Sequence, residues 1–157
     1  MVQDLGSGDV LDAVLPDTPQ PPASVLKAFT ALYAIETLGP EHRFATRVIA
    51  TKPVVNGVLD GDLILAGGGN PNLVTDELAT LAKTLKDSGL REVKGDFLVW
   101  DNALSNIDEI DAGQDDYLGY IPPITGLNLN YNRVHFEWKR EGSDFDTQLD
   151  ARSENFS

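Results

Sequence analysis

The chain has 157 residues, and its 25 acidic and 12 basic side chains give a formal net charge of −13. That charge argues against nucleic acid or an anionic membrane surface as a partner. Cysteine is absent, which excludes disulfides and thiolate metal sites. A chain of this length buries roughly two thirds of its unfolded surface, enough for one ordinary domain or two partial ones.

Targeting signals are not found in the sequence. No apolar run reaches about 18 residues, and no basic segment followed by an apolar one stands at the N-terminus. We therefore expect neither a membrane span nor a signal peptide among these residues. Either the chain starts after a signal or the protein is cytoplasmic.

The first 40 residues predict a hairpin, a linker and a helix. Residues 1–5 and 10–15 are typical of two short strands joined by a tight polar turn. Residues 16–22 hold four prolines and predict an extended linker. Residues 25–38 are apolar nearly all round a helix, which is typical of a buried central helix, and Gly39 and Pro40 end it.

Ser24 and Lys27 stand one turn apart where this helix begins. Residues at i and i+3 share a helix face, so the hydroxyl and the amine are predicted to meet. A serine nucleophile needs an adjacent base, and a lysine amine serves as one when desolvation lowers its pKa; the buried helix would supply that desolvation. In the alternative, Ser24 is only a helix N-cap. The spacing alone does not decide, because it arises by chance in roughly half of chains this long.

After residue 40 the pattern predicts a separate module. Residues 44–51 and 58–65 are β-rich, and Asn56-Gly57 is a strong hairpin signal. The glycines at 67–69 predict a strand-to-helix turn, because the lysine and hydroxyl of a phosphate-binding loop are missing. We expect Thr75 to cap the next helix, Gly89 to close it, and residues 93–100 to form a buried strand. Strand, helix and strand over 58–100 make a βαβ-like unit.

The last third alternates between acidic and β-rich segments. Residues 101–132 hold six acids and no Lys, Arg or His, and we interpret them as a solvated loop because calcium-loop spacing is absent. Residues 127–131 alternate like a strand, and a phase shift predicts a bulge or bend at Asn132-Arg133. Residues 145–151 are expected to return as a strand. His42 and His135 lack the neighbours of a metal site.

Three stretches together resemble the D-alanyl-D-alanine carboxypeptidase/endopeptidase family related to penicillin-binding protein 4. They are Pro22-Ala23-Ser24-Val25-Leu26-Lys27, Gly61-Asp62-Leu63-Ile64-Leu65-Ala66-Gly67-Gly68-Gly69-Asn70-Pro71 and Leu127-Asn128-Leu129-Asn130-Tyr131-Asn132-Arg133-Val134. The resemblance implies an α+β fold. Residues 1–43 would be the opening segment of a β-lactamase/transpeptidase-like catalytic domain, and residues 44–157 part of an inserted α+β domain.

The resemblance also implies an activity. Ser24 would be the catalytic nucleophile of a serine-type carboxypeptidase and Lys27 the group that takes its proton. The substrates would be peptidoglycan stem peptides ending in D-Ala-D-Ala, β-lactam antibiotics would be covalent inhibitors, and the location would be the periplasm. No metal or organic cofactor is implied.

Two further motifs of the family are not matched convincingly. Ser153-Glu154-Asn155 has the letters of the serine-x-asparagine motif but lies in the inserted region, and we interpret it as coincidence. The lysine-threonine-glycine motif is absent, since Leu85 follows Lys83-Thr84 and Ile124 precedes Thr125-Gly126. We therefore expect an N-terminal part of an enzyme, with little activity alone. The alternative is a non-catalytic cell-wall binding or assembly module.

Overall fold

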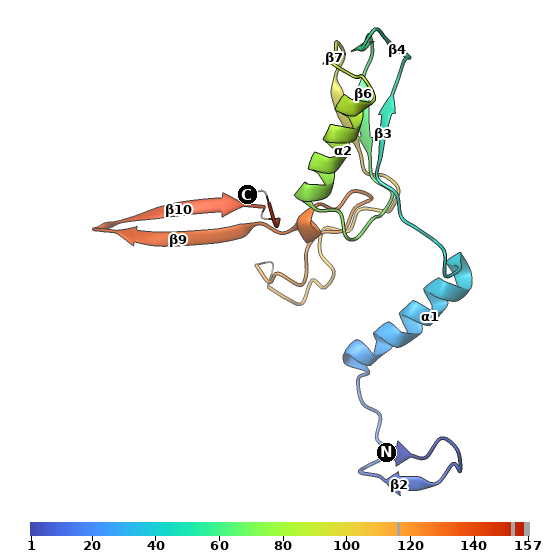
Figure 1. Ribbon diagram of the computed structural model, residues 1–157. Coiled ribbons are helices and arrows are strands. Elements are labelled where there is room, and N and C mark those ends of the chain that lie inside the picture. The colour runs from blue at the N-terminus through green and yellow to red at the C-terminus, as the bar shows by residue number, and fades with distance from the viewer. Residues whose placement is uncertain (116, 152, 156–157) are drawn as a thin grey trace. The chain divides into compact units, whose positions relative to one another are not determined.

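The computed structural model describes residues 1–115, 117–151 and 153–155. The chain divides into two compact units, Met1–His42 and Arg43–Ser157. The fold is mixed α+β, with two α-helices and four small sheets among the described residues (Figure 1). No helix in the described part of the chain is long and apolar enough to cross a membrane.

The first unit begins with the predicted hairpin. Strands β1 (Val2–Gln3) and β2 (Val10–Asp12) pair antiparallel. Asp4 holds the turn, because its Oδ1 accepts hydrogen bonds from the backbone N–H groups of Ser7 (2.7 Å) and Gly6 (2.9 Å). These bonds stabilise the carboxylate and hold the pKa of Asp4 below its usual range.

A 3₁₀ turn, η1 (Ala23–Val25), leads into helix α1 (Leu26–Leu38). Gly39 ends α1 with φ 84°, a left-handed conformation that glycine adopts without strain. The prediction that this helix is buried is wrong for the described chain, since no residue of α1 is buried and Tyr33 is 73% exposed. Burial needs a facing surface, and the two-stranded hairpin of the same unit is too small to surround an apolar helix.

The second unit contains the predicted βαβ arrangement. Its larger sheet has the order β3 (Arg47–Ala50), β6 (Leu63–Ala66), β8 (Phe97–Trp100). The smaller has the order β4 (Val54–Val55), β5 (Val58–Leu59), β7 (Glu92–Val93). Helix α2 (Thr75–Asp87) lies between β6 and β7 in the sequence. Strand β6 pairs in parallel with β8, and β5 pairs in parallel with β7. Asn56 (φ 50°) and Gly57 (φ 82°) make the predicted hairpin turn between β4 and β5.

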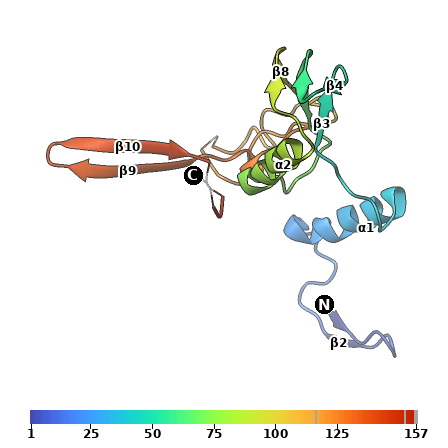
Figure 2. The ribbon, with the colours of Figure 1, turned by 45° about the horizontal axis from the view of Figure 1, so that its top comes forward.

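The core of this unit lies between α2 and the strands. Figures 1 and 2 both show α2 beside the larger sheet. Leu59 is completely buried, and Leu63 and Leu65 of β6 are each 9% exposed. Leu78 and Leu81 of α2 are half-buried, and their i, i+3 spacing places them on one face of the helix.

The predicted buried strand over residues 93–100 is wrong in two respects. It is two strands, β7 and β8, separated at Gly95, whose backbone N–H bonds to Gly61 O at 3.1 Å. The four side chains of β8 are also exposed, from 43% for Leu98 to 62% for Phe97. A continuous apolar run predicts a buried strand only where chain is present on both sides of it.

The glycine run forms the turn between β6 and α2, as predicted. A Cβ added at Gly67 would lie 2.3 Å from Gly126 O, and one added at Gly68 would lie 2.2 Å from Ala45 O. The glycines therefore allow three backbone segments to approach closely.

Residues 127–131 do not form the predicted strand. Asn130, Tyr131 and Asn132 have φ of 48°, 60° and 51° and form a left-handed turn, η2 (Asn130–Asn132). The chain thus bends earlier than predicted. Asparagine tolerates this conformation, and the Asn132 side chain accepts a bond from Leu129 N at 3.0 Å. The hairpin of β9 (His135–Glu141) and β10 (Asp144–Asp150) follows as expected.

The start of α2 differs from the prediction. The helix begins at Thr75 itself, with Val74 in the N-cap position, so Thr75 is not the cap. The Asn130 side chain replaces it, since its Oδ1 accepts the hydrogen bond of Thr75 N at 3.1 Å from 55 residues away. A distant asparagine satisfies a helix-end donor that a local side chain was expected to satisfy.

Candidate active site

The Ser24 and Lys27 side chains are in direct contact. Ser24 lies in η1 and Lys27 in the first turn of α1. Lys27 Nζ donates a hydrogen bond to Ser24 Oγ at 2.8 Å. The i, i+3 spacing at the start of the helix therefore places the two side chains as predicted.

Ser24 is not a helix cap. Val25 occupies the N-cap position of α1 and Pro22 that of η1, and neither helix has a side-chain cap hydrogen bond. The Leu26 backbone N–H bonds to the carbonyl oxygens of Ala23 and Ser24. The Ser24 hydroxyl thus contacts the Lys27 amine and not the helix backbone.

The backbone just before the serine is strained. Ala23 has φ 45°, the left-handed region that an alanine adopts at a cost of roughly 1–2 kcal/mol. Such conformations persist where the surrounding structure imposes them, and they cluster at functional sites.

The arrangement places an amine within proton-transfer distance of a serine hydroxyl. Both residues are exposed in this chain. A lysine amine accepts a proton only in its neutral form, which removal of water favours. The hydroxyl–amine contact that a serine nucleophile and a lysine base require is therefore present, whereas the dry surroundings expected from a buried helix are not.

The segment Ser153-Glu154-Asn155 contacts α2. Asp76, in the first turn of α2, accepts hydrogen bonds from Glu154 N (2.8 Å) and Asn155 N (3.2 Å). Desolvation raises the pKa of the Asp76 carboxyl, but bonds from Asn155, Ser153 and Glu154 outweigh it and hold this pKa below its usual range. These hydrogen bonds hold the segment against α2. This local structural role agrees with our interpretation that its match to the serine-x-asparagine motif is a coincidence.

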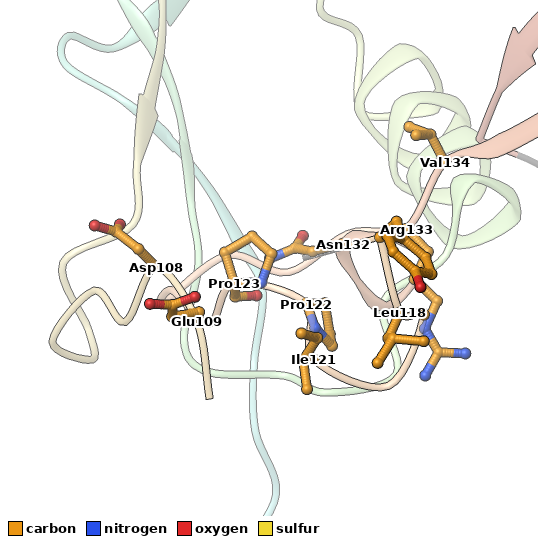
Figure 3. A pocket seen from close by; sticks show the side chains of 11 residues that line it. Asp108, Glu109, Leu118, Ile121, Pro122, Pro123, Asn132, Arg133 and Val134 are labelled. Carbon is orange, nitrogen blue, oxygen red and sulfur yellow. The ribbon is translucent and has the colours of Figure 1, made fainter. Parts of the chain in front are cut away.

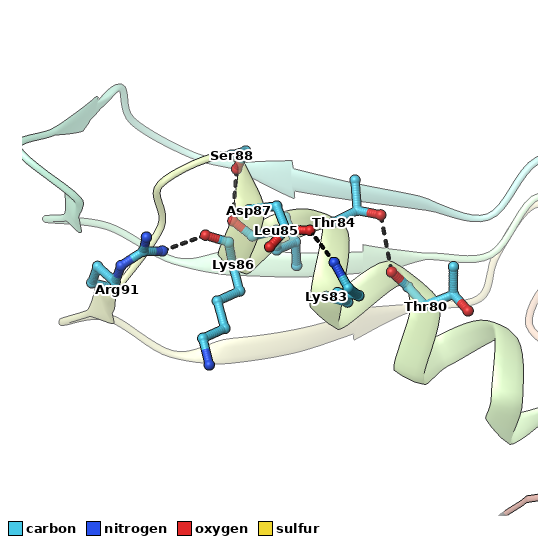
Figure 4. Close-up of polar contacts among 8 residues, drawn as sticks. All are labelled: Thr80, Lys83, Thr84, Leu85, Lys86, Asp87, Ser88 and Arg91. Carbon is cyan, nitrogen blue, oxygen red and sulfur yellow. Dashed lines mark hydrogen bonds and ion pairs between the residues drawn. The ribbon is translucent and has the colours of Figure 1, made fainter.

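The partial matches to the lysine-threonine-glycine motif also have local roles. Lys83 pairs with Asp87 along α2, and Thr84 Oγ1 donates to Thr80 O at 2.9 Å (Figure 4). Thr125 Oγ1 donates to Leu127 O at 2.7 Å within a turn. These side chains satisfy polar groups of their own segments.

A cavity of about 380 Å³ opens in the second unit beside η2 (Figure 3). Asp108, Glu109 and Arg133 supply the charges of its lining, and Ile121 and Pro122 part of its apolar surface. The sequence pattern predicts only an acidic loop here, because the cavity lining comes from segments up to 26 residues apart whose proximity no local pattern indicates. Among the described residues no group of three or more His, Cys, Asp or Glu could hold a metal ion, and Asp116 lies outside them.

Relatives of known activity match this chain. The sequence is 35% identical over 111 residues to a D-alanyl-D-alanine carboxypeptidase of Actinomadura sp. (strain R39), a match covering 69% of this chain and 20% of that protein. It is 34% identical over 86 residues to the D-alanyl-D-alanine carboxypeptidase DacB of Haemophilus influenzae, covering 55% and 18%. The chain thus spans about a fifth of the length of these relatives.

Solved structures of penicillin-binding protein 4 also resemble this chain. Penicillin-binding protein 4 (dacB) from Haemophilus influenzae superposes with a TM-score of 0.67 at 26% identity, over 82% of this chain and 29% of that one. The same protein complexed with a novel β-lactam gives a TM-score of 0.59 at 27% identity, over 82% and 26%.

Fold and relatives together place the chain among proteins of mixed α+β architecture that resemble D-alanyl-D-alanine carboxypeptidases. The model of the D-Ala-D-Ala carboxypeptidase 3 (S13) family matches residues 1–156, so the chain belongs to that family. The resemblance carried by the three sequence stretches is thereby confirmed.

Proposed function

We propose that the complete protein is a serine-type carboxypeptidase that removes the terminal D-alanine from peptidoglycan stem peptides, with Ser24 as nucleophile. The observation that carries this proposal is the 2.8 Å hydrogen bond between Lys27 Nζ and Ser24 Oγ in a chain of a carboxypeptidase family. The cross-links between stem peptides are the second candidate substrate. These substrates lie outside the cytoplasm, so we place the protein in the periplasm.

The chemistry divides one difficult step into two. Ser24 Oγ attacks the carbonyl carbon of the penultimate D-alanine while the neutral Lys27 amine takes its proton. The C–O bond forms, the C–N peptide bond breaks, and the departing D-alanine amine receives that proton. Water then hydrolyses the ester, its proton returns to Ser24 Oγ, and the shortened peptide leaves.

The proposed domain organisation explains the exposed helix. Residues 1–43 would open the transpeptidase-like catalytic domain, and residues 44–157 would be part of the inserted α+β domain. The remainder of the catalytic domain would then cover α1, bring the missing motifs to Ser24 and exclude water from Lys27. Groups that act as a unit lose most of the rate when some are missing, so the 157-residue chain alone should have little carboxypeptidase activity.

Penicillin labelling of the complete protein tests the nucleophile. A β-lactam mimics the D-Ala-D-Ala end and should leave a stable acyl adduct on Ser24, located by intact-protein mass spectrometry and peptide mapping. Ser24→Ala should abolish the adduct while costing the fold at most about 0.5 to 1.5 kcal/mol, the usual contribution of one hydrogen bond. Ser143→Ala, in the exposed β9–β10 turn, is the matched control and should label normally.

Lys27→Ala tests the base. It should slow acylation roughly 100- to 10,000-fold with the fold intact, the usual contribution of a general base. An adduct on another serine, or undiminished labelling of Ser24→Ala, would show that Ser24 is not the nucleophile. Absence of any adduct on the complete protein would favour the alternative of a non-catalytic cell-wall binding or assembly module.

A further inference from the structure

The turn between β4 and β5 contains Asn56-Gly57, the one asparagine–glycine pair of the chain. Asn56 is exposed. Within the described part of the chain, no hydrogen bond engages its side chain or the backbone N–H of Gly57. The side-chain amide carbon of an asparagine and the nitrogen of the next residue can close a succinimide ring, and glycine favours this reaction because it has no Cβ to block the approach. The two reacting groups are therefore free and adjacent at this turn.

Strand β4, which leads into the turn, is held by few contacts. Its residues Val54 and Val55 are 44% and 63% exposed, and they pair with β5 alone because the smaller sheet has the order β4-β5-β7. Short edge strands of this kind open locally at a small part of the free energy of global unfolding. In the closed turn the backbone is fixed, with φ 50° at Asn56 and φ 82° at Gly57. Opening frees rotation about ψ of Asn56, so that its side chain reaches the Gly57 nitrogen.

We propose that Asn56 is a site of spontaneous deamidation, and that the isoaspartate it yields loosens the smaller sheet. Gly57 N loses its proton to hydroxide and bonds to Asn56 Cγ, the bond from Cγ to Nδ2 breaks, and Nδ2 takes a proton from water and leaves as ammonia. Water then opens the succinimide. Attack at the side-chain carbonyl gives aspartate, and attack at the main-chain carbonyl gives isoaspartate, in which the chain continues through the former side chain. The reaction is independent of the activity proposed above.

The contacts of Gly57 show what the altered backbone disturbs. Gly57 O accepts hydrogen bonds from Arg91 N at 2.8 Å and Glu92 N at 3.1 Å, which join the turn to the start of β7. The turn is also closely packed, since a Cβ added at Gly57 would lie 3.0 Å from Gly89 O and 3.2 Å from Arg91 Cγ. Isoaspartate inserts a CH₂ group into the main chain just before Gly57. A two-residue turn lengthened in this way no longer matches the register of its strands, so both bonds to Gly57 O should weaken.

Ageing of the complete protein in mildly alkaline buffer tests the reaction. Mass spectrometry after pepsin digestion in acid should find Asn56 converted at least about tenfold faster than Asn102, an exposed asparagine followed by alanine, because alanine carries a Cβ. Part of the product should accept a methyl group from an isoaspartyl methyltransferase, an enzyme that recognises isoaspartate. Equal conversion of Asn56 and Asn102, or an Asn56 that stays unmodified, would overturn the proposal.

Hydrogen exchange tests the effect on the sheet. The isoaspartate form, separated by ion exchange through its added negative charge, should exchange the Arg91 and Glu92 amides at least about tenfold faster than the unaged protein. Two controls should retain slow exchange. Freshly prepared Asn56→Asp carries the same charge on an unaltered backbone, and aged Asn56→Gly suits this turn but cannot form the product. Unchanged exchange in the isoaspartate form, or equal acceleration in Asn56→Asp, would overturn the inference that the longer backbone loosens the sheet.

Discussion

Asn130 joins three segments of the second unit, and its replacement should destabilise that unit more than any exposed asparagine would. The side chain is 6% exposed. Its Oδ1 accepts from Thr75 N at 3.1 Å, and its Nδ2 donates to Thr75 Oγ1 at 2.7 Å and to Ala151 O at 2.9 Å. One amide thus connects the start of α2, the left-handed turn and the segment after β10.

The magnitude for Asn130→Ala follows from these contacts. Each of the three lost hydrogen bonds contributes about 1 kcal/mol. Alanine at φ 48° adds about 1 kcal/mol, because it tolerates the left-handed region less well than asparagine. We expect a loss of about 4 kcal/mol, a large part of the usual stability of a domain.

Two variants separate the contributions. Asn56→Ala, at an exposed turn residue with φ 50°, changes the same residue type and backbone conformation without the buried bonds, and should cost about 1 kcal/mol. Asn130→Gly relieves the strain and should retain the cost of the lost bonds, about 3 kcal/mol.

Urea unfolding followed by tryptophan fluorescence measures these differences, since Trp100 and Trp138, the only tryptophans of the chain, both lie in the second unit. Hydrogen exchange at the Thr75 amide provides a local measurement and should accelerate in both Asn130 variants. If Asn130→Ala costs no more than Asn56→Ala, the buried amide does not connect these segments as we infer.

Three further predictions address other parts of the chain. The pKa of Asp76 is lower in the folded than in the unfolded chain, so the stability that the ionised carboxylate contributes is present above the unfolded pKa and is lost as the pH falls below about 4 through the folded pKa. The urea midpoint should therefore decline more steeply in this range for the wild type than for Asp76→Asn. Parallel curves for the two proteins would contradict this prediction. Gly67→Ala places a Cβ 2.3 Å from a carbonyl oxygen and should cost about 3 kcal/mol or more, whereas Gly119→Ala, whose Cβ meets nothing closer than 4.0 Å, should be nearly neutral by thermal unfolding. Limited proteolysis should cut first within residues 16–22 or 101–116, and early cleavage inside β7 or β8 would show that the second unit is not packed independently.

The sequence predicted features that depend on near neighbours. The β1–β2 and β4–β5 hairpins follow from alternation and turn residues, and α2 from its apolar period. The contact of Ser24 with Lys27 follows from helical spacing, which fixes side-chain positions within one turn. The family was also recognisable from short stretches, and the match over residues 1–156 confirms it.

Only the tertiary structure decided which surfaces are covered and which distant groups meet. The apolar patterns of α1 and β8 indicate a capacity for burial, but burial requires a facing surface, and the described chain does not supply one. Asn130 caps the start of α2 from a position 55 residues later in the sequence. The sequence predicted a turn at the glycine run, but it did not predict that other backbone segments pack against this turn. Such contacts depend on how segments pack in three dimensions, and the periodicity of a single segment does not indicate which other segment it will contact.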